Sequence, residues 1–444
     1  MHADLIIVGA GMVGSALALA LKDSGLNILL LDSGSLTLKP FDPQSAFEPR
    51  VSALSMASQR ILERVGAWDG ILARRSSPYA QMQVWDGSGT GNIHFAASSV
   101  HADLLGHIVE NQVIQDALLE QLLASPVQLL NNARLESLRR TVDGWLLTLA
   151  DGRELQAPLL VAADGANSAV RRLAGCATRE WDYLHHAIVT SVRCSQPHQL
   201  TAWQRFTDDG PLAFLPLARD GDQHWCSIVW SCVPEHAEQL MALDDAGFAS
   251  ELGKAFELRL GEVLQVDPRM CIPLRQRHAK RYVEQGLALI GDAAHTIHPL
   301  AGQGVNLGFL DAAVLAEGAG ELANGFISVG GASTPELASD AMKEFVDRYT
   351  KMFGEYNDES NTKVYALEYI LATMAANPAA MTDVEAFKTT MDTFEAPNPY
   401  MVGDAKLKYV GTTSFGQKRQ LSVPLVVNVF KDGAFETMFV AQVD

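Results

Sequence analysis

Three glycines near the N-terminus have the spacing of a phosphate-binding turn. The motif Gly9-x-Gly11-x-x-Gly14 follows the apolar run Leu5 to Val8 and precedes a segment rich in alanine and leucine. In such a turn the first glycine permits a tight bend, the second lets the backbone approach a pyrophosphate, and the third lets a helix pack closely on a strand. The unpaired N–H groups at the start of that helix face the phosphates. The motif therefore predicts a dinucleotide site.

An acidic residue lies where a ribose-binding carboxylate is expected. Asp32 follows a second apolar run, Ile28 to Leu31, and in dinucleotide-binding folds this acid comes about 20 residues after the glycines. The alternative is an ordinary surface turn, because Asp32 begins the sequence Asp-Ser-Gly. Together the glycines and the acid do not distinguish FAD from NAD.

A second candidate site comes near residue 300, where an apolar run is followed by an acid, a proline and closely spaced glycines. These residues are Gly291, Asp292, His295, Pro299, Gly302, Gly304, Val305 and Asn306. We expect a strand that ends at the acid, then a loop, then a helix that begins near Gly304. The N-terminus of such a helix stabilises negative charge, for example on a reduced isoalloxazine ring. The alternative is a plain loop and a capped helix.

Two smaller signals lie beside these motifs. His295 and His298 have the spacing of metal ligands, but no third ligand of suitable type accompanies them, so we predict no metal site. His295 is interpreted as a packing residue or a catalytic candidate. Asp164-Gly165, with Arg171 behind it, follows another apolar run, which suits a plain turn as well as a site. Its order relative to the other motifs favours a site.

The elements needed to position these residues follow from the apolar patterning. The first motif lies in a βαβ unit, a helical pattern runs from Val51 to Val65, and another runs from Val113 to Leu123. Between residues 176 and 270, β-branched and aromatic residues alternate with turns, which predicts a mostly antiparallel sheet with a helix near Pro234 to Leu243.

Composition narrows the class of protein. The chain has 444 residues, of which 48% are hydrophobic and 19% are charged, as in a globular protein of two or three domains. A net charge of −18 without a basic patch argues against nucleic-acid binding. Five scattered cysteines without a C-x-x-C pair argue against disulfides or zinc and favour the cytoplasm. We expect neither a signal peptide nor a transmembrane segment, because glycines interrupt the apolar stretch that begins at Leu5.

These motifs, in this order, resemble the class A flavoprotein monooxygenases of the para-hydroxybenzoate hydroxylase type. Within that group the chain is similar to the ubiquinone-biosynthesis hydroxylases, in particular the 2-octaprenylphenol hydroxylases, over about residues 3–317. The segments that carry the resemblance are Arg50 to Ser55, Leu105 to Asn111, Ala163 to Ser168, Trp181 to His186, Leu212 to Leu217 and Gly291 to Gly308.

The resemblance implies an α/β fold with two domains. A discontinuous, Rossmann-type FAD-binding domain would comprise residues 1–75, 103–175 and 271–325. A mostly antiparallel β-sheet substrate domain would be inserted as residues 76–102 and 176–270.

The resemblance also implies how FAD is held. The adenosine half would lie on Gly9, Gly11, Gly14 and Asp32, where the family usually carries Glu in place of the Asp. Arg50 would approach the pyrophosphate and Asp292 the ribityl chain, and Pro299 would line the reaction cavity. Gly304, Val305 and Asn306 would face the flavin pyrimidine ring. Further cofactor contacts are expected from the motifs that contain Glu110, Asn111, Asp164, Gly165, Gly291 and Gly302.

The activity implied is hydroxylation of a prenylated phenol of ubiquinone biosynthesis. NAD(P)H would bind transiently and reduce the flavin, and O₂ would form a C4a-hydroperoxide that attacks the ring. The residues leave the general base unassigned. A lipophilic substrate suggests peripheral contact with a membrane or a biosynthetic complex. The alternatives are another FAD-dependent oxidoreductase, such as an isoprenoid reductase, or a halogenase, although the halogenase signature W-x-W-x-I-P is absent.

The resemblance ends near Glu317. Residues 326–444 instead resemble part of an α/β type I periplasmic solute-binding protein, through Phe345 to Gly354, Tyr365 to Ile370 and Val427 to Phe435. The sequence therefore suggests a fusion or chimera. A third hypothesis follows, in which this C-terminal segment leaves an FAD-binding core that is inactive as an enzyme.

Overall fold

The computed structural model describes residues 1–38, 40–297 and 302–318, together with the segments 327–330, 395–397, 406–410, 420–422, 425–431 and 434–441 and residues 386, 389 and 390. The chain divides into two compact units, Met1–Ala316 and Glu317–Asp444. Every predicted site residue belongs to the first unit.

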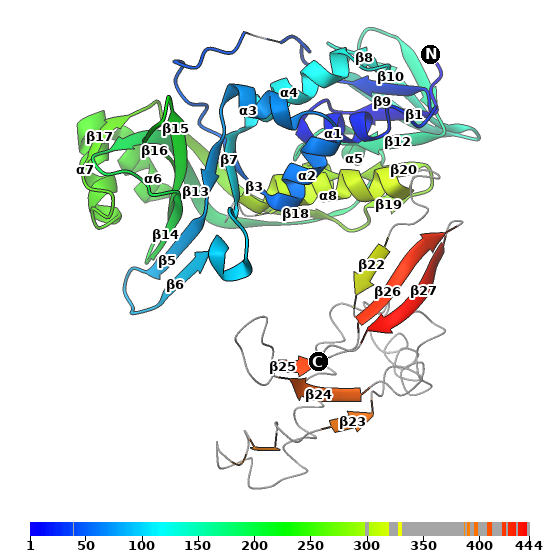
Figure 1. Cartoon of the computed structure of the whole chain (residues 1–444). Coiled ribbons are helices and arrows are strands. Elements are labelled where there is room, and N and C mark those ends of the chain that lie inside the picture. Colours follow the sequence, from blue (N-terminus) through cyan, green and yellow to red (C-terminus); the bar gives the residue numbers. More distant parts are fainter. Residues whose placement is uncertain are drawn as a thin grey trace. The chain divides into compact units, whose positions relative to one another are not determined.

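The first unit contains a mainly parallel sheet of six strands (Figure 1). In spatial order its strands are β19 (Val283–Glu284), β20 (Leu287–Leu289), β12 (Leu159–Ala162), β1 (Leu5–Val8), β2 (Ile28–Leu31) and β8 (Gln128–Leu130). The helices that follow strands of this sheet are α1 (Met12–Ala20) and α5 (Ala169–Leu173). The predicted βαβ unit at the N-terminus is confirmed, since β1 and β2 pair in parallel on either side of α1 in sequence.

Strand β1 lies near the middle of this sheet, between β12 and β2, and all four of its residues are buried. Such a strand, covered on both faces, reads in sequence as a continuous apolar run. Because β1, β12 and β20 all run in parallel, the residues that follow each strand meet at one edge. The three predicted motifs are those residues.

A small second sheet and three helices extend this domain. The sheet consists of β3 (Val51–Ser55), β7 (Gly106–Glu110) and β4 (Ser77–Tyr79), and the helices are α2 (Met56–Arg64), α3 (Trp68–Arg74) and α4 (Asn111–Leu123). The predicted helix from Val51 to Val65 is wrong in its first part, because Val51 to Ser55 pairs antiparallel with β7. The helix begins only after Ser55, whose side chain accepts a hydrogen bond from the Ser58 N–H.

A large sheet of nine strands forms the other side of the unit. Its strands are β21 (His295–Thr296), β18 (Met270–Ala279), β13 (Thr178–Cys194), β16 (Asp222–Cys232), β15 (Gly210–Arg219), β14 (Thr201–Thr207), β5 (Gln81–Asp86), β6 (Asn92–Ala96) and β17 (Val263–Val266). Most neighbours are antiparallel, as the sequence predicted, although β14 and β5 are parallel.

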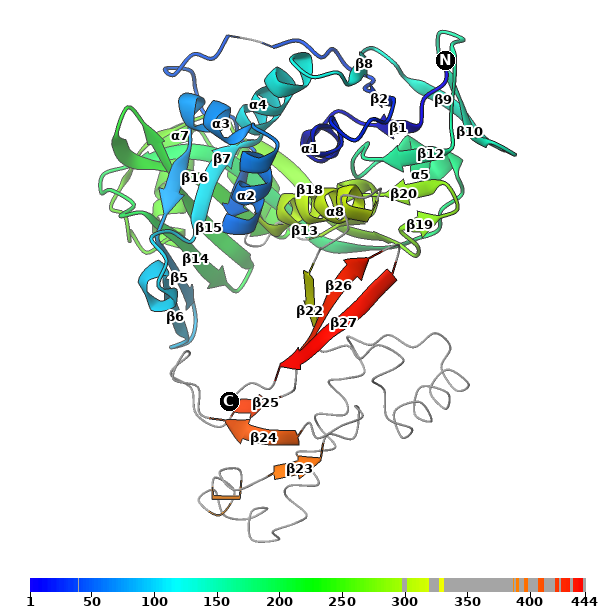
Figure 2. The ribbon, with the colours of Figure 1, turned by 45° about the vertical axis from the view of Figure 1, so that its right-hand side comes forward.

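The two faces of this sheet have different neighbours. Helices α6 (Pro234–Ala242) and α7 (Asp245–Ala255) lie on the face turned away from α1 and α8 (Gln303–Gly318) (Figures 1 and 2). On that face alternate β16 residues, among them Ile228 and Trp230, form a core with Phe248. The intervening β16 residues face the sheet of β3, β7 and β4, and on this side Trp225 forms a core with Phe47.

A meander of β9 (Leu135–Thr141), β10 (Gly144–Leu149) and β11 (Glu154–Ala157) accompanies the parallel sheet, and short 3-10 turns lie at Ala97–Val100 and Gly291–Ala293. In the second unit β22 (Ile327–Gly330), β26 (Leu425–Lys431) and β27 (Ala434–Ala441) form one sheet, and β23 (Glu395–Pro397), β24 (Lys406–Val410) and β25 (Gln420–Ser422) form another. Within the described residues no helix is both long and apolar enough to cross a membrane.

Candidate active site

The glycine turn after β1 has two crowded positions and one open position. A Cβ atom on Gly9, whose φ is +106°, would lie 2.4 Å from the Ala163 carbonyl oxygen, and one on Gly14 would lie 1.9 Å from the Gly9 carbonyl oxygen. A Cβ on Gly11 would meet no heavy atom within 4 Å. Gly9 and Gly14 therefore serve the packing of α1 on the sheet. Gly11 leaves a cradle at the N-terminus of α1, where no side chain caps the free N–H groups.

Asp32 secures this turn from the neighbouring strand. One carboxylate oxygen accepts a hydrogen bond from the Ala10 N–H at 2.8 Å, and the other accepts from the Gly34 N–H at 2.7 Å. A carboxylate has about four acceptor positions, so capacity remains for ribose hydroxyls.

The Asp164 motif is tied to the Gly291 motif by Arg171. Asp164 caps α5 through one oxygen, which accepts from the Ala169 N–H at 2.7 Å. Its other oxygen is buried and has no hydrogen-bond partner among the described residues. The Arg171 guanidinium donates to the Ala166 and Ala293 carbonyls, both at 2.7 Å. Gly165, at φ +78°, allows the tight turn that links Asp164 to Ala166. Two segments that are far apart in sequence thus share one edge.

Asp311, which sequence reasoning missed, holds the Gly291 motif in place from α8. One of its oxygens accepts from the Gly291 N–H at 2.8 Å and lies 2.7 Å from His295 Nε2. Burial alone would lower the pKa of His295, but the hydrogen bond and charge of Asp311, with the charge of Asp292, outweigh it and raise that pKa. The sequence signal was an acidic residue inside an apolar helical stretch.

The Asp292 side chain is exposed to solvent, although much of the protein lies around its carboxyl group. The surrounding protein raises the pKa of the Asp292 carboxyl, while the positive charges of His295 and Arg50 act in the opposite direction. The structure therefore brings Arg50 and Asp292 into electrostatic reach, as two predicted ligands of one cofactor need. The Arg50 side chain is 58% exposed and 3.9 Å from Glu48.

The Asn306 side chain connects the start of α8 to β3 through hydrogen bonds. Its amide oxygen accepts from the Ser55 N–H at 3.0 Å and the Ser58 hydroxyl at 2.6 Å. Its amide nitrogen donates to the carbonyls of Ala53 at 2.8 Å and Gly302 at 3.2 Å. All the side chain's hydrogen-bonding capacity is used within the protein. The backbone at Gly304 and Val305 is what remains at this helix N-terminus to face a flavin ring.

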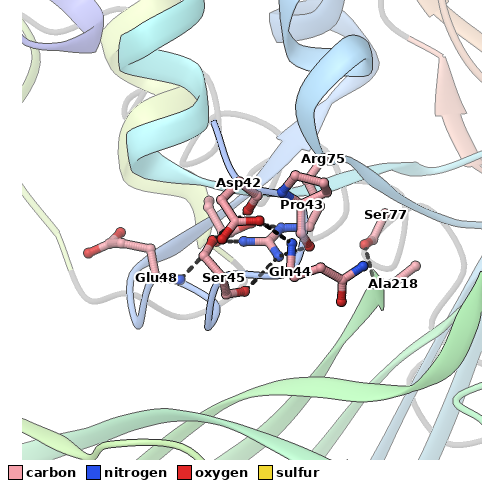
Figure 3. Close-up of polar contacts among 9 residues, drawn as sticks. Asp42, Pro43, Gln44, Ser45, Glu48, Arg75, Ser77 and Ala218 are labelled. Atoms are coloured by element: carbon pink, nitrogen blue, oxygen red, sulfur yellow. Dashed lines mark hydrogen bonds and ion pairs between the residues drawn. The ribbon is translucent and has the colours of Figure 1, made fainter. Parts of the chain in front are cut away.

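Glu110 is engaged in a buried ion pair with Arg75. The two guanidinium–carboxylate hydrogen bonds are 2.6 Å and 2.8 Å long, and the two side chains are 4% and 8% exposed. Glu110 also accepts from the Glu48 N–H at 2.8 Å. Arg75 donates to the Pro43 and Ser45 carbonyls, and Figure 3 shows it beside the segment that contains them. Glu110 therefore positions this loop, and its predicted contact with the cofactor stays a prediction.

Asn111 fixes the next part of the loop. Its N–H donates to the Arg50 carbonyl at 3.0 Å, and its side-chain oxygen accepts from the Ser52 hydroxyl at 2.7 Å. The pair Glu110 and Asn111 thus sets the path of the backbone that carries Arg50.

An apolar cavity with an inner volume of about 100 Å³, partly open to solvent, lies between β3 and the large sheet. Its lining residues are Val51, Ala53, Tyr79, Met82, Ile108, Ala202, Trp203, Gln204, Pro211, Ala213, Leu215, Val229, Ser231 and Gly302. The Ser231 side chain is buried, and its hydroxyl has no hydrogen-bond partner among the described residues. Burial raises the pKa of Tyr79.

The cavity reaches the flavin-type motif through Gly302. A Cβ on Gly302, at φ +62°, would lie 2.9 Å from the Ala53 nitrogen, so the glycine permits this close approach. Pro299 and His298 lie outside the described residues, and the predicted role of Pro299 stays a prediction.

Comparison with known proteins decides the family. Residues 2–326 match the family model described as FAD binding domain. The 3-demethoxyubiquinol 3-hydroxylase of Escherichia coli strain K12 is 42% identical over 309 residues, which cover 69% of this chain and 77% of that protein. The chain belongs to the FAD-dependent class A flavoprotein monooxygenases.

Other relatives agree. The ubiquinone hydroxylase UbiL of Rhodospirillum rubrum is 38% identical over 320 residues, covering 71% of this flavoprotein and 72% of that one. The solved structure of PqsL from Pseudomonas aeruginosa matches with a TM-score of 0.60 at 22% identity, over 88% of this chain and all of PqsL, which shows the shared fold. The solute-binding resemblance of residues 326–444 stays a prediction.

Replacing Arg75 with methionine should destabilise the flavoprotein by about 3–5 kcal/mol, because it leaves Glu110 buried without its partner. The neighbouring Arg74 provides a matched control, since its partner Glu120 is 51% exposed. Arg74→Met should cost less than about 1 kcal/mol. Urea unfolding followed by tryptophan fluorescence measures both. Equal losses in the two variants would contradict the assignment.

The charge pair of His295 with Asp311 should make stability depend on pH. Because the folded-state pKa of His295 is raised above 6.5, its stabilising effect is complete below pH 6.5 and is lost as pH rises through the raised value. Asp311→Asn should therefore cost roughly 1.5–3 kcal/mol at low pH and less at high pH.

Urea titrations of the wild type and of Asp311→Asn across pH measure this gap. In a His295→Gln background the pH-dependent part should vanish. A gap that stays constant, or that widens as pH rises, would show that His295 is not the titrating partner.

Proposed function

We propose that this flavoprotein hydroxylates the ring of a prenylated phenol in ubiquinone biosynthesis. The observation that carries the proposal is the apolar cavity that begins at Gly302, beside the flavin-type motif, and extends along the large sheet. An apolar cavity with a few polar groups suits a ring with one or two oxygen substituents and a hydrocarbon tail. The two relatives described above are named for hydroxylation of ubiquinol or ubiquinone compounds.

The residues around the glycine turn fit FAD. We infer that the pyrophosphate lies over Gly11, where the structure leaves open space at the N-terminus of α1. Asp32 retains capacity for the ribose, and Arg50 supplies positive charge on the same side as Asp292. The α8 N-terminus favours negative charge on the reduced flavin, and so does His295 in its protonated form, which the raised pKa of His295 stabilises. The Asp164 oxygen without a partner offers a further acceptor.

The chemistry that bound FAD supplies is activation of O₂ for transfer of one oxygen atom to the ring, with NAD(P)H as the reductant typical of this family. The protein's own contribution is orientation and exclusion of water. Val51, Ala53 and Ile108 present apolar surface next to Gly302, where water would otherwise compete. Farther along, we infer that the Ser231 hydroxyl hydrogen-bonds an oxygen of the substrate.

We propose that the enzyme works in the cytoplasm and meets its lipophilic substrate at a membrane surface or within a biosynthetic complex. All five cysteines are free, as in a reducing compartment. Exposed apolar side chains such as Ile93 and Phe95, which are 55% and 50% exposed, are available for such contacts.

Gly11→Ala should weaken FAD binding at least about tenfold without unfolding the protein, because a Cβ atom would enter the space assigned to the pyrophosphate. Gly91→Ala is the control, since its Cβ would make only an ordinary contact with Asp86 at 3.6 Å. Flavin fluorescence titration of the apoprotein gives both affinities. Unchanged affinity in Gly11→Ala would exclude this placement of the cofactor.

Ala213→Trp should fill the cavity and lower product formation at least about tenfold. The control, Ser250→Trp, places the same side chain on exposed α7. The assay is mass analysis of product from a short-chain prenylated phenol incubated with FAD and NAD(P)H. Flavin content should stay at the wild-type level in both variants. Wild-type product from Ala213→Trp would show that the substrate lies elsewhere, and a wild type that takes up no FAD would overturn the function itself.

A further inference from the structure

Three side chains with metal-binding atoms meet on the large sheet, on the face that carries α6. They are Asp209, in the turn between β14 and β15, Cys232, the last residue of β16, and His236, in the first turns of α6. One ligand atom from each lies within 4.8 Å of the other two. The cluster is separate from the cavity, because Cys232 packs in the core beneath α6 whereas the preceding residue, Ser231, lines the cavity.

The protein holds these groups in place. One Asp209 oxygen accepts from the Val233 N–H at 3.1 Å, and the other is hydrogen-bonded to His236 Nδ1. The His236 ring packs edge-on against Trp230, with ring centroids 5.7 Å apart. The Asp209 carbonyl is in turn 3.1 Å from His185 Nε2. The three ligands therefore come from rigid element ends that already converge.

The donor set is selective. A thiol sulfur, an imidazole nitrogen and a carboxylate oxygen are the ligand types that Zn²⁺ takes, at about 2.0–2.3 Å in tetrahedral geometry. Ligand atoms bound tetrahedrally to one zinc ion lie about 3.3–3.8 Å apart by these distances, so movements of about an ångström suffice. We propose that Asp209, Cys232 and His236 bind one zinc ion, with water as the fourth ligand.

Exposure fits this arrangement. The Cys232 side chain is fully buried, whereas His236 and Asp209 are 38% and 26% exposed, so an ion reaches the site from solvent and keeps a water there. The sulfur lies on the protein side of the ion, and the other two ligands lie toward solvent.

Binding exchanges a proton for the metal. Burial, together with the nearby Asp209 carboxylate, raises the pKa of Cys232 to about 12, so the free site carries a thiol. Zinc displaces the thiol proton to solvent as the Zn–S bond forms, and it replaces the hydrogen bond between His236 and Asp209. No electron transfer is involved. The ion would cross-link the β14–β15 turn, the end of β16 and α6. This structural role would be separate from substrate binding.

The experiment uses the full-length, FAD-loaded protein, freed of metal by chelation and dialysis. Zinc titration against a chromophoric chelator should give one ion per chain, and zinc should raise the midpoint of thermal unfolding. Cobalt(II) should give d–d absorption bands of tetrahedral intensity at longer wavelength than the flavin. His236→Gln and Cys232→Ser should each lower zinc affinity at least about tenfold.

Matched controls separate this site from general binding. Asp208→Asn alters the neighbouring carboxylate, and Cys176→Ser alters a cysteine in a distant segment, so both should keep wild-type zinc affinity, whereas Asp209→Asn should not. His236→Gln guards against a fold defect in Cys232→Ser, because His236 is partly exposed. Absence of stoichiometric zinc binding, or binding that His236→Gln leaves unchanged, would overturn the proposal. Neither result bears on hydroxylation.

Discussion

The buried pair of Arg75 and Glu110 is the interaction on which the geometry of the site depends. Arg75 follows α3 and Glu110 ends β7, and between them they hold the backbone at Pro43, Ser45 and Glu48. A buried ion pair is tolerated when further hydrogen bonds satisfy both partners, and these backbone groups do so. The pair thus fixes the loop from Pro43 to Glu48, and Asn111 fixes the backbone at Arg50 that follows it.

The same loop joins the two domains. Phe47 packs under the Arg75 guanidinium at 4.3 Å and against Trp225 of the large sheet at 5.4 Å between ring centroids. The Ala218 N–H donates to the Ser77 hydroxyl at 2.8 Å, in the group that Figure 3 shows. This polar network and the apolar core around Phe47 and Trp225 therefore help to set the cavity wall formed by β3 relative to the wall formed by β15.

Local sequence patterns were sufficient to predict the residues that shape the backbone of the glycine turn. Gly14 and Asp32 contact the same turn, at Gly9 and Ala10, and the motif already contained these roles. Gly9 is crowded by the distant Ala163 carbonyl, but its positive φ was implied by the motif alone. The family resemblance then supplied the cofactor and the order of the domains. The strand at Val51 to Ser55 was missed because its pairing partner, β7, is distant in sequence and tertiary pairing overrode the local helical pattern.

Local sequence patterns could not reveal residues whose partners lie in distant segments of the chain. Arg75 and Asp311 carry no motif of their own, and their roles exist only once β7, α3, α8 and the Gly291 turn are adjacent. The resemblance places Glu110 and Asn306 near the flavin, which stays a prediction, and the structure adds the protein partners that their side chains bind. The cluster at Cys232 escaped notice because Asp209 reaches it only through the fold of the sheet.

The proposed reaction transfers one atom of O₂ to a prenylated phenol held beside Gly302. The decisive experiment incubates the FAD-loaded protein with NAD(P)H, the phenol and isotopically labelled O₂ and analyses the product by mass. We expect a product that carries one labelled oxygen atom on the ring. Oxidation of NAD(P)H that yields only hydrogen peroxide, or a product whose new oxygen comes from water, would contradict it.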